Sequence, residues 1–274
     1  LKNKEDVMKS IFTSKQIEYL KTNYDKMSYK EIADNLGFTE RQVRGKINGL
    51  GFTKRRQFNN EYFKHIDKPS QAYWLGFIYA DGYLVCKPQS GSHELGIELK
   101  QTDIELLECF NKELGDVHKI YTQHKHKTFN GYQYETDSCI IRVYSQEIVE
   151  DLIKLSVYPN KTNRIEFPKC ENFFWDFFRG FNDGDGCLHI SKKNHMFVQL
   201  TNSNKNFLEY LNNSICSLLN IKGSIYKETD HKYRLVYFRK NDTKLLLDTI
   251  YKDENCMKLQ RKYEIYKSYY GSLI

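Results

Sequence analysis

Two aspartates, Asp81 and Asp185, are the residues whose surroundings point most clearly to chemistry. Each occupies the eighth place of a nine-residue stretch that carries glycine at its third and ninth places. If each stretch is a helix, its carboxylate faces the negative end of the helix macrodipole, which is unfavourable by roughly 0.3–1 kcal/mol. If the two helices pack together, the carboxylates also repel each other. A bound divalent cation removes this conflict, because hard cations take carboxylate oxygens as ligands.

The elements that position these aspartates are predicted to be two similar helices. The stretch 74–82 has almost no polar face, so its helix should be buried on most sides. Gly76 and Gly180 each cost a helix roughly 1 kcal/mol relative to Ala, which is tolerable where two backbones approach closely. Gly82 and Gly186 fit the position just past a helix end, where a left-handed backbone is needed. The alternative interpretation is a pair of exposed Asp-Gly turns without function.

Both stretches, 74–82 and 178–186, resemble the nine-residue signature of the LAGLIDADG homing endonuclease family. The shared features are Gly in place three and Asp-Gly in places eight and nine. The sequence departs from the family pattern at three places. Tyr79 stands at place six of the first copy, and Arg179 and Asn182 stand at places two and five of the second. These departures leave the metal-binding places unchanged.

The resemblance implies a metal site and a reaction. In the family the place-eight acids bind the catalytic metal, which here means Asp81 and Asp185. Backbone carbonyl groups of the facing motif help, which here means those of Ala80 and Gly184. The resemblance further implies Mg²⁺ as the cofactor, with Mn²⁺ or Ca²⁺ able to take its place. The implied reaction is hydrolysis of double-stranded DNA to staggered ends with 3′ overhangs.

Polar residues near the aspartates are expected to order water and to stabilise the transition state. Gln101 and Asn202 follow the second predicted strand of each half and match the place where the family has such a residue. Lys240 and Arg239 are the basic residues expected to steady the transition state in the second half. Ser145 occupies the equivalent place in the first half, and this asymmetry predicts unequal cleavage of the two DNA strands.

An internal duplication predicts the fold. The two aspartates lie 104 residues apart, and the order helix-strand-strand-helix-strand-strand-helix occurs twice. We therefore expect an α+β protein with two pseudo-symmetric αββαββα LAGLIDADG half-domains and antiparallel saddle sheets, preceded by a small all-α helix-turn-helix domain. Such sheets leave one face open, here toward the major groove, where base identity is readable. The predicted domains are a helix-turn-helix domain at 1–52, a basic linker at 53–71, a first half-domain at 72–165 and a second at 166–274.

The helix-turn-helix prediction depends on two capping boxes. Ser28 with Glu31 and Thr39 with Gln42 open two short helices that are joined at Gly37. Two such helices with apolar facing sides are typical of a helix-turn-helix. The alternatives are a helical bundle for protein contacts and a linker that is only a solvated connector. The residues expected to contact DNA are Arg41, Arg44 and Lys46 on the last helix and Lys54, Arg55 and Arg56 in the linker.

The charge distribution favours a polyanionic partner. The formal net charge is +7, a modest signal. Residues 1–70 hold 15 of the 42 basic and 9 of the 35 acidic residues, so this quarter carries +6 and the remainder only +1. Base contacts made by the remainder must therefore come from individual side chains. The candidates, chosen by their position on predicted strands, are Glu98, Lys100, Gln123, Lys125, Arg142, Gln199, Lys227 and Arg239.

Composition narrows the class of protein further. No apolar run approaches the ~18 residues of a membrane span, and no signal peptide is visible. Seven scattered cysteines without paired spacing favour reduced thiols over a disulfide framework or a zinc site. His124 and His126 are interpreted as a loop or strand edge near DNA and not as a metal site. The expected location is the cytoplasm or the nucleoid, and phage, bacterial and organellar origins are not distinguished.

Two other functions share this scaffold. A transcriptional regulator would bind DNA without cutting, but a pure binder gains nothing from two acids near phosphate. An intron maturase would use the same saddle to bind intron RNA. Only a binding assay distinguishes this function from that of a DNA endonuclease. The favoured prediction is a monomeric, single-chain, site-specific endonuclease whose partner is double-stranded DNA.

Overall fold

The computed structural model of the protein describes residues 12–52, 58–87, 91–129, 131–159, 167 and 170–271. The chain divides into two compact units, Leu1–Gln57 and Phe58–Ile274. Each unit has a hydrophobic core of its own. The smaller unit contains the residues predicted to form a helix-turn-helix, and the larger one contains both halves of the duplication.

Three capped helices form the smaller unit. The Ser28 hydroxyl accepts a hydrogen bond from Glu31 N, and the Glu31 carboxylate accepts one from Ser28 N. Thr13 and Thr39 each form the same box with the residue three places on. Gly37 joins the last two helices with a φ of 71°, a value that favours glycine. The helices are α1 (Ser14–Asn23), α2 (Tyr29–Leu36) and α3 (Glu40–Gly49).

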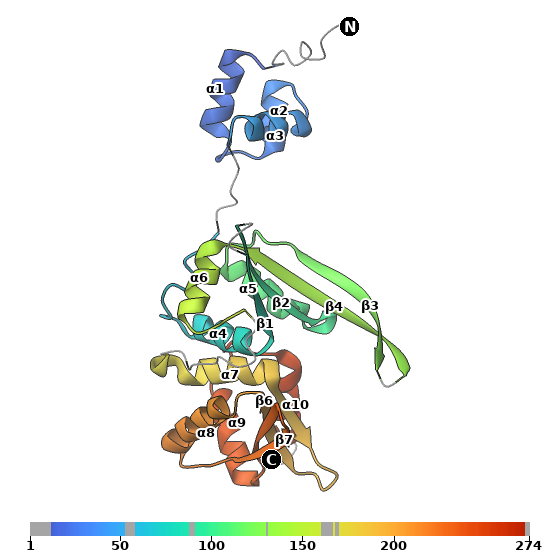
Figure 1. Cartoon of the computed structure of the whole chain (residues 1–274), viewed down its shortest axis with the longest axis vertical. Coiled ribbons are helices and arrows are strands. Elements are labelled where there is room, and N and C mark those ends of the chain that lie inside the picture. The colour runs from blue at the N-terminus through green and yellow to red at the C-terminus, as the bar shows by residue number, and fades with distance from the viewer. Residues whose placement is uncertain are drawn as a thin grey trace. The chain divides into compact units, whose positions relative to one another are not determined.

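Two four-stranded antiparallel sheets form the larger unit, one from each half of the duplication (Figure 1). The strand orders are β1-β2-β4-β3 and β5-β6-β8-β7, so the halves share one topology. Each half has the order αββαββα, which confirms the predicted α+β fold. The strands are β1 (Gly82–Lys87), β2 (Ser92–Lys100), β3 (Ile120–Phe129), β4 (Tyr132–Tyr144), β5 (Gly186–Ile190), β6 (Met196–Asn202), β7 (Ser224–Thr229) and β8 (Lys232–Tyr237).

Helices α4 and α7 lie side by side between the two sheets (Figure 1). Every residue of α4 from Gln71 to Tyr79 is buried, as its lack of a polar face predicts. Helices α5 and α6 pack against the first sheet, and α8, α9 and α10 pack against the second. The helices are α4 (Pro69–Asp81), α5 (Ile104–Glu113), α6 (Gln146–Lys154), α7 (Phe174–Asp185), α8 (Lys205–Leu219), α9 (Lys240–Ile250) and α10 (Gln260–Gly271).

The predicted linker at 53–71 is too long. Residues 53–57 lie outside the described ranges, but the larger unit begins at Phe58. Tyr62 and Phe63 are buried in its core, and the Gln71 side-chain amide donates a hydrogen bond to Tyr62 O. These aromatic residues pack from turns and not from a helix, so the absence of helical periodicity concealed their contribution to the core.

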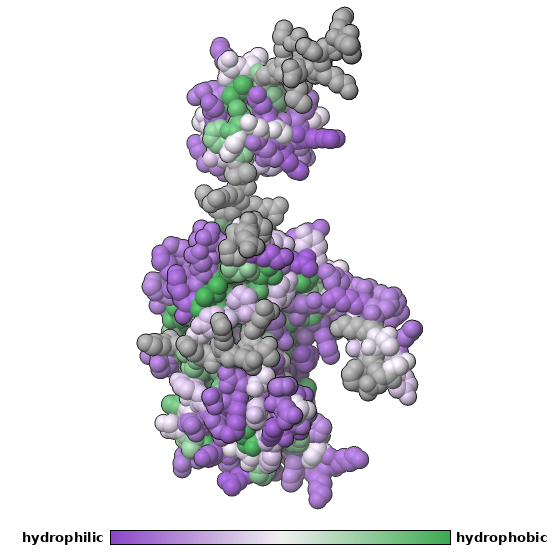
Figure 2. All heavy atoms as spheres, in the orientation of Figure 1, coloured by the Kyte–Doolittle hydropathy of each residue, from purple (hydrophilic) through white to green (hydrophobic). Residues whose placement is uncertain are grey.

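The hairpin of β3 and β4 extends beyond the rest of the first sheet (Figure 1). Strand β2 pairs with β4 only from Ser138 to Tyr144, and among the described residues the stretch 132–137 pairs with β3 alone. Figure 2 shows this extension as largely hydrophilic. It is therefore a two-stranded arm held by its own ladder.

Candidate active site

Helices α4 and α7 cross at their glycines. A Cβ atom added to Gly76 would lie 2.0 Å from the Phe177 carbonyl oxygen, and one added to Gly180 would lie 1.9 Å from the Tyr73 carbonyl oxygen. Only hydrogen fits at either position, so the two backbones are in direct contact. The predicted close approach at Gly76 and Gly180 is confirmed.

The prediction of a left-handed backbone at Gly82 and Gly186 is wrong. Their φ values are −74° and −80°, in the extended region. Glycine is needed there for a steric reason. A Cβ atom on Gly82 would lie 2.7 Å from Ile78 Cγ2, and one on Gly186 would lie 2.3 Å from Asn182 O. The chain turns directly from each helix into a strand, which brings the glycine back against the last helical turn.

The two predicted catalytic aspartates stand at adjacent helix ends. Asp81 is the last residue of α4, and Asp185 is the last residue of α7. A Cβ atom added to Gly184 would lie 2.3 Å from Ala80 Cβ and 3.3 Å from Asp81 Oδ2. The carboxylate of the first motif therefore lies against the backbone of the second. We call the contact between α4 and α7 at these ends the seam. Asp81 is exposed and Asp185 is half-buried, so the seam offers accessible carboxylate oxygens, which are ligands that fit Mg²⁺.

A buried lysine that the sequence analysis missed lies at the end of α7. The Lys262 side chain reaches from α10, and Nζ donates hydrogen bonds to the carbonyl oxygens of Asn182 and Asp183 at 2.7 Å each and of Gly186 at 2.5 Å. Burial lowers the pKa of Lys262, while Asp183 and Asp81 oppose this shift. The ammonium group places positive charge at the negative end of the helix dipole, a role that the sequence analysis gave to a metal ion alone.

Asp183, the place-six acid of the second motif, joins the two halves. It is fully buried, and its Oδ2 accepts hydrogen bonds from Tyr73 Oη at 2.9 Å and from Leu259 N at 2.7 Å. Burial raises the pKa of Asp183 to about 6, and Lys262 opposes this shift. The contacts connect α4, α7 and the start of α10, so the C-terminal helix is part of the seam.

Two of the three residues that depart from the family signature, Arg179 and Tyr79, have hydrogen-bond partners of their own. The buried Arg179 guanidinium donates to the Asp176 carboxylate and to two backbone carbonyl groups, one at the end of α9 and one in the segment before α10. Tyr79 Oη donates to Leu155 O at 2.6 Å, just past α6. Each of these side chains ties a segment of its own half to a central helix. Asn182 is fully buried, and its amide has no hydrogen-bond partner among the described residues.

Replacing Lys262 by Met is expected to destabilise the larger unit by about 3–5 kcal/mol, because removal of one buried charge leaves its partners uncompensated. Urea unfolding followed by tryptophan fluorescence measures this change, since Trp74 and Trp175 both lie in the larger unit. Lys267→Met is the matched control on the same helix. It breaks an exposed ion pair, and such pairs contribute little. Equal effects of the two substitutions would contradict the role assigned to Lys262.

The two polar residues predicted beside the aspartates lie at the ends of β2 and β6. Gln101 opens the 3₁₀ turn after β2 and is exposed. Asn202 is the last residue of β6, and its Oδ1 accepts a hydrogen bond from Asn204 N at 2.9 Å, which fixes the turn before α8. Their part in catalysis stays a prediction.

Neither of the basic residues predicted for the second half lies on a strand. Strand β8 ends at Tyr237, Arg239 precedes α9 and Lys240 is its first residue. The placement of Arg239 on a base-reading strand is therefore wrong. Ser145, at the corresponding place of the first half, caps α6 through its hydroxyl. The asymmetry between Ser145 and Lys240 is present, and its effect on catalysis stays a prediction.

The predicted base contacts of the first half share the open face of its sheet. Leu95, Ile97 and Leu99 turn toward the core, so the alternate residues of β2 face outward. The strand register extends this open face across β4 and β3. Two ion pairs lie on this face and orient its basic side chains, Lys125 toward Glu98 and Arg142 toward Glu94. The residues of this set are Glu98, Lys100, Gln123, Lys125 and Arg142, and their contact with DNA stays a prediction.

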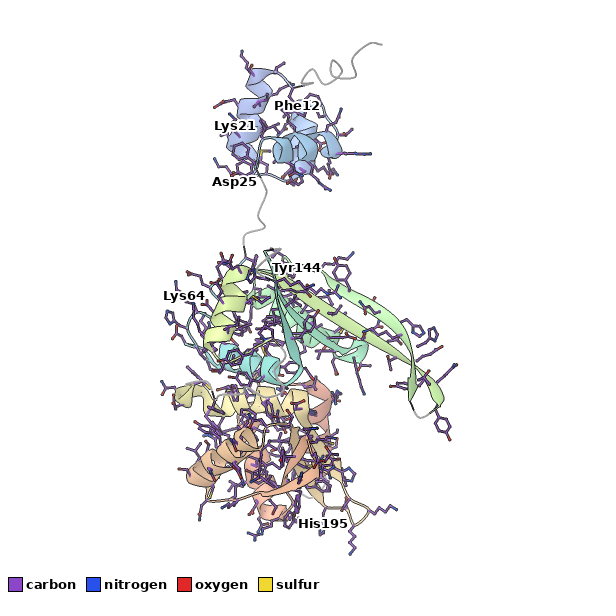
Figure 3. All side chains as sticks on the ribbon, in the orientation of Figure 1. Phe12, Lys21, Asp25, Lys64, Tyr144 and His195 are labelled. Carbon is purple, nitrogen blue, oxygen red and sulfur yellow. The ribbon has the colours of Figure 1, made fainter. Side chains whose placement is uncertain are left out.

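Exposed tyrosines on the same face were missed by the sequence analysis. Tyr121, Tyr134 and Tyr144 are 45%, 45% and 63% exposed on β3 and β4, and Tyr144 is labelled in Figure 3. Tyrosine hydroxyls are among the groups that contact DNA phosphates. Strand alternation was the signal that could have found them, because Tyr134 and Tyr144 lie an even number of residues from Arg142.

In the second half, Gln199 lies on the open face of its sheet and Lys227 does not, and contact of Gln199 with DNA stays a prediction. The neighbours of Gln199 on β6 are buried, so Gln199 itself faces outward. Arg234 lies on the open face, and so does Tyr226, its register partner on β7. Lys227 is adjacent to Tyr226 in the strand and therefore lies on the opposite face. Lys227 instead pairs with Asp230 at 2.8 Å. The assignment of Lys227 to the base-reading face is therefore wrong, and Arg234 occupies that face.

In the smaller unit, helix α3 presents the predicted basic side chains. Arg41 and Arg44 are exposed and Lys46 is half-buried. The Arg44 guanidinium lies over the Tyr29 ring, 5.4 Å from its centre. Their contact with DNA stays a prediction. The remaining predicted contacts, Lys54, Arg55 and Arg56, lie outside the described residues.

Two further observations concern membrane-spanning helices and the state of the cysteines. Within the described ranges no helix has the length and apolar character needed to cross a membrane. All seven cysteines fall within these ranges, and all are free thiols. The buried Cys170 thiol has a pKa raised to about 12 by burial, so this thiol is protonated at neutral pH.

Two αββαββα halves joined through paired, acid-ending helices define the two-motif LAGLIDADG fold. The family of LAGLIDADG-like domains matches residues 175–262. Among solved structures, the meganuclease I-SmaMI bound to uncleavable DNA with a TTGT central four is similar, with a TM-score of 0.50 and 16% identity over 74% of this chain and 87% of that chain. The I-SmaMI LAGLIDADG homing endonuclease bound to cleaved DNA gives the same four values.

These findings confirm the resemblance. The second half of the chain contains a LAGLIDADG-like domain, and the larger unit has the fold of LAGLIDADG homing endonucleases. At 16% identity the structural likeness shows the fold alone. A sequence comparison with curated proteins gives no match.

Proposed function

We propose that this protein is a monomeric, site-specific endonuclease that hydrolyses double-stranded DNA with a divalent cation. The observation that carries the proposal is the seam of α4 and α7, where Asp81 Oδ2 lies against the backbone of Gly184. Asp185 follows directly in the chain. Two carboxylates at one seam, flanked by two open antiparallel sheets, suit the cleavage of one phosphodiester bond in each strand. The resemblance to the family adds staggered ends with 3′ overhangs to the proposal.

In this proposal Asp81 and Asp185 hold Mg²⁺, and the carbonyl groups of Ala80 and Gly184 assist them. Mn²⁺ and Ca²⁺ take the same oxygen donors. When bound, the cation activates water, neutralises the developing charge and stabilises the leaving oxygen. The residues of the chain supply the position of the donors, because the glycine crossing fixes the distance between the two helix ends.

Other side chains have supporting roles in the proposal. Lys262 restrains the last turn of α7 through three carbonyl groups and so holds Asp185 in place. Gln101 and Asn202 order water near the phosphates, and Lys240 stabilises charge in the transition state. With Lys240 on one side and Ser145 on the other, the two DNA strands are cut at unequal rates.

The open faces of the two sheets bind DNA in this proposal. Each sheet presents hydrogen-bonding and charged side chains at the spacing of alternate strand residues, which suits readout of base edges in the major groove. Helix α3 of the smaller unit adds a separate basic face. The protein therefore reads a long site through two units, with phosphate contacts that set position and base contacts that set sequence.

The direct test incubates the purified full chain with the DNA that flanks its own coding sequence, in Mg²⁺, and sequences all new ends. One discrete double-strand cut with a 3′ overhang is expected, and chelation of the metal should abolish it. DNA binding without cutting in Mg²⁺ or Mn²⁺ would instead support a regulator. Preferential binding of flanking intron RNA would support a maturase.

Deleting residues 1–52 is expected to weaken DNA binding and to flatten its dependence on salt. Each phosphate contact contributes about 0.9 to the slope of log K against log salt concentration, so loss of the contacts proposed for Arg41, Arg44 and Lys46 should lower the slope by roughly 2–3. Fluorescence anisotropy at several salt concentrations measures both quantities. The full chain with Arg41→Gln and Arg44→Gln is the control that keeps the fold, and it should lower the slope by roughly 2. An unchanged slope in both proteins would assign the smaller unit another role.

A further inference from the structure

Two histidines and two carboxylates occupy one face of the β3–β4 arm. Strand register pairs His124 with Asp137 and His126 with Glu135. Residues two apart on a strand share a face, so the four side chains form two neighbouring cross-strand pairs. Within the described ranges, His124, His126 and Glu135 are the only group of three His, Cys, Asp or Glu residues whose ligand atoms all lie within 4.8 Å of one another.

Each histidine of this group lies close to one oxygen of the Glu135 carboxylate. His124 Nε2 is 3.5 Å from Glu135 Oε2, and His126 Nδ1 is 3.2 Å from Glu135 Oε1. In a tetrahedral zinc site, bonds of about 2.0–2.2 Å place neighbouring ligand atoms roughly 3.4 Å apart. Small side-chain movements are therefore sufficient to close the group around a metal.

The Asp137 carboxylate fixes the orientation of His124. His124 Nδ1 is 2.7 Å from Asp137 Oδ1, and because an ionised carboxylate only accepts, Nδ1 must donate the hydrogen. In the neutral ring the lone pair then lies on Nε2, which faces Glu135. A lone pair and a carboxylate repel each other unless a proton or a metal cation lies between them. Histidine ligands of metals commonly have such a carboxylate partner behind the ring.

We propose that His124, His126 and Glu135 bind one Zn²⁺ ion and that Asp137 positions His124 for this role. Two imidazoles and a carboxylate suit late divalent transition metals, whereas Mg²⁺ prefers oxygen donors alone. The site therefore differs in chemistry from the aspartate pair at the seam. This proposal replaces the interpretation of His124 and His126 as a loop or strand edge near DNA and not a metal site, because the register places carboxylates opposite both histidines.

The position of the site gives the ion a mechanical effect. Strand alternation places the histidines on the face opposite Lys125 and Gln123, the side chains proposed to meet DNA. The bound ion leaves that surface open. It cross-links β3 to β4 in the part of the arm that, among the described residues, pairs with no other strand. Zinc therefore stiffens the arm without occupying its DNA-facing surface.

Calorimetric titration of the full chain with ZnCl₂ tests the proposal. The wild-type protein should bind one more equivalent of Zn²⁺ than His126→Ala. Any Zn²⁺ held by exposed thiols elsewhere in the chain is the same in both proteins, so the difference measures this site. Asp137→Asn should weaken binding at this site roughly 10–100-fold, as expected for loss of a carboxylate behind a ligating histidine. His231→Ala, on the corresponding β7–β8 hairpin, is the control and should bind as the wild type does.

Hydrogen exchange measured by mass spectrometry locates the effect. Zinc should slow amide exchange in β3 and β4 of the wild type and of His231→Ala, but not of His126→Ala. Mg²⁺ at millimolar concentration should not reproduce this protection. Equal zinc stoichiometry in the wild type and His126→Ala, or unchanged exchange in the arm, would overturn the proposal and leave two histidine–carboxylate ion pairs. Neither measurement depends on DNA cleavage.

Discussion

Replacing Asp185 by Asn is expected to reduce DNA cleavage by at least about 10³-fold while leaving DNA binding nearly unchanged. The amide keeps the size of the side chain but lacks the charge that holds a divalent cation. A catalytic metal contributes several kcal/mol of transition-state stabilisation, and each 1.36 kcal/mol corresponds to a factor of ten in rate. Asp81→Asn is expected to behave in the same way, because both carboxylates serve one seam. Gel-shift and cleavage assays on the same target measure the two effects separately.

Asp230→Asn provides the matched control for this experiment. Asp230 is an exposed acid in the turn between β7 and β8, paired with Lys227, and its replacement removes the same charge from the same half of the protein. It should leave cleavage unchanged. Weakened binding by Asp185→Asn, with unchanged cleavage per bound complex, would show that the aspartate serves recognition and not catalysis.

Replacing Gly180 by Ala is expected to destabilise the larger unit by at least about 3 kcal/mol, the upper part of the range for overpacked cores. The added methyl group would lie 1.9 Å from the Tyr73 carbonyl oxygen and 2.9 Å from Phe77 N. Both are backbone atoms of α4, so no side-chain rotation relieves the clash and the helices must separate. Urea unfolding monitored by tryptophan fluorescence measures the loss. Cleavage should fall as well, because separation moves the two aspartates apart.

Gly271→Ala is the control for this substitution. Gly271 is the last residue of α10, and a Cβ atom there meets nothing within 4 Å. Alanine is the better helix former, so the change should be neutral or slightly stabilising. A loss of less than about 1 kcal/mol for Gly180→Ala would contradict direct backbone contact at the crossing.

Local patterns were sufficient to predict the fold of the larger unit and the position of Asp81 and Asp185 at the ends of two packed helices. The capping boxes of α2 and α3, the crossing glycines and the acids at two helix ends each follow from residues within about nine positions of one another. The duplicated order of helices and strands then determined the architecture. The backbone at Gly82 and Gly186 was misjudged, because a glycine after a helix can satisfy either a left-handed turn or a tight return into a strand.

Residues that depend on distant partners could not be predicted. Lys262 contacts the end of α7 from a helix about 80 positions further along the chain, and nothing in the local pattern of α10 marks it as buried. Strand β7 is exposed along most of its length, so no hydrophobic alternation indicated which face Lys227 occupies. The cross-strand partners of His124 and His126 depend on the register of the arm, which the sequence alone did not give.

The contacts of α10 have a consequence for synthesis of the protein. Leu259 N and Lys262 Nζ supply hydrogen bonds to the buried Asp183 carboxylate and to the end of α7. While these residues are still inside the ribosome, the Asp183 carboxylate and the end of α7 lack the hydrogen bonds and the cation that stabilise them in the folded protein. We therefore expect the joint between the halves to close only after translation has passed this helix, so that the two aspartates reach their final positions late.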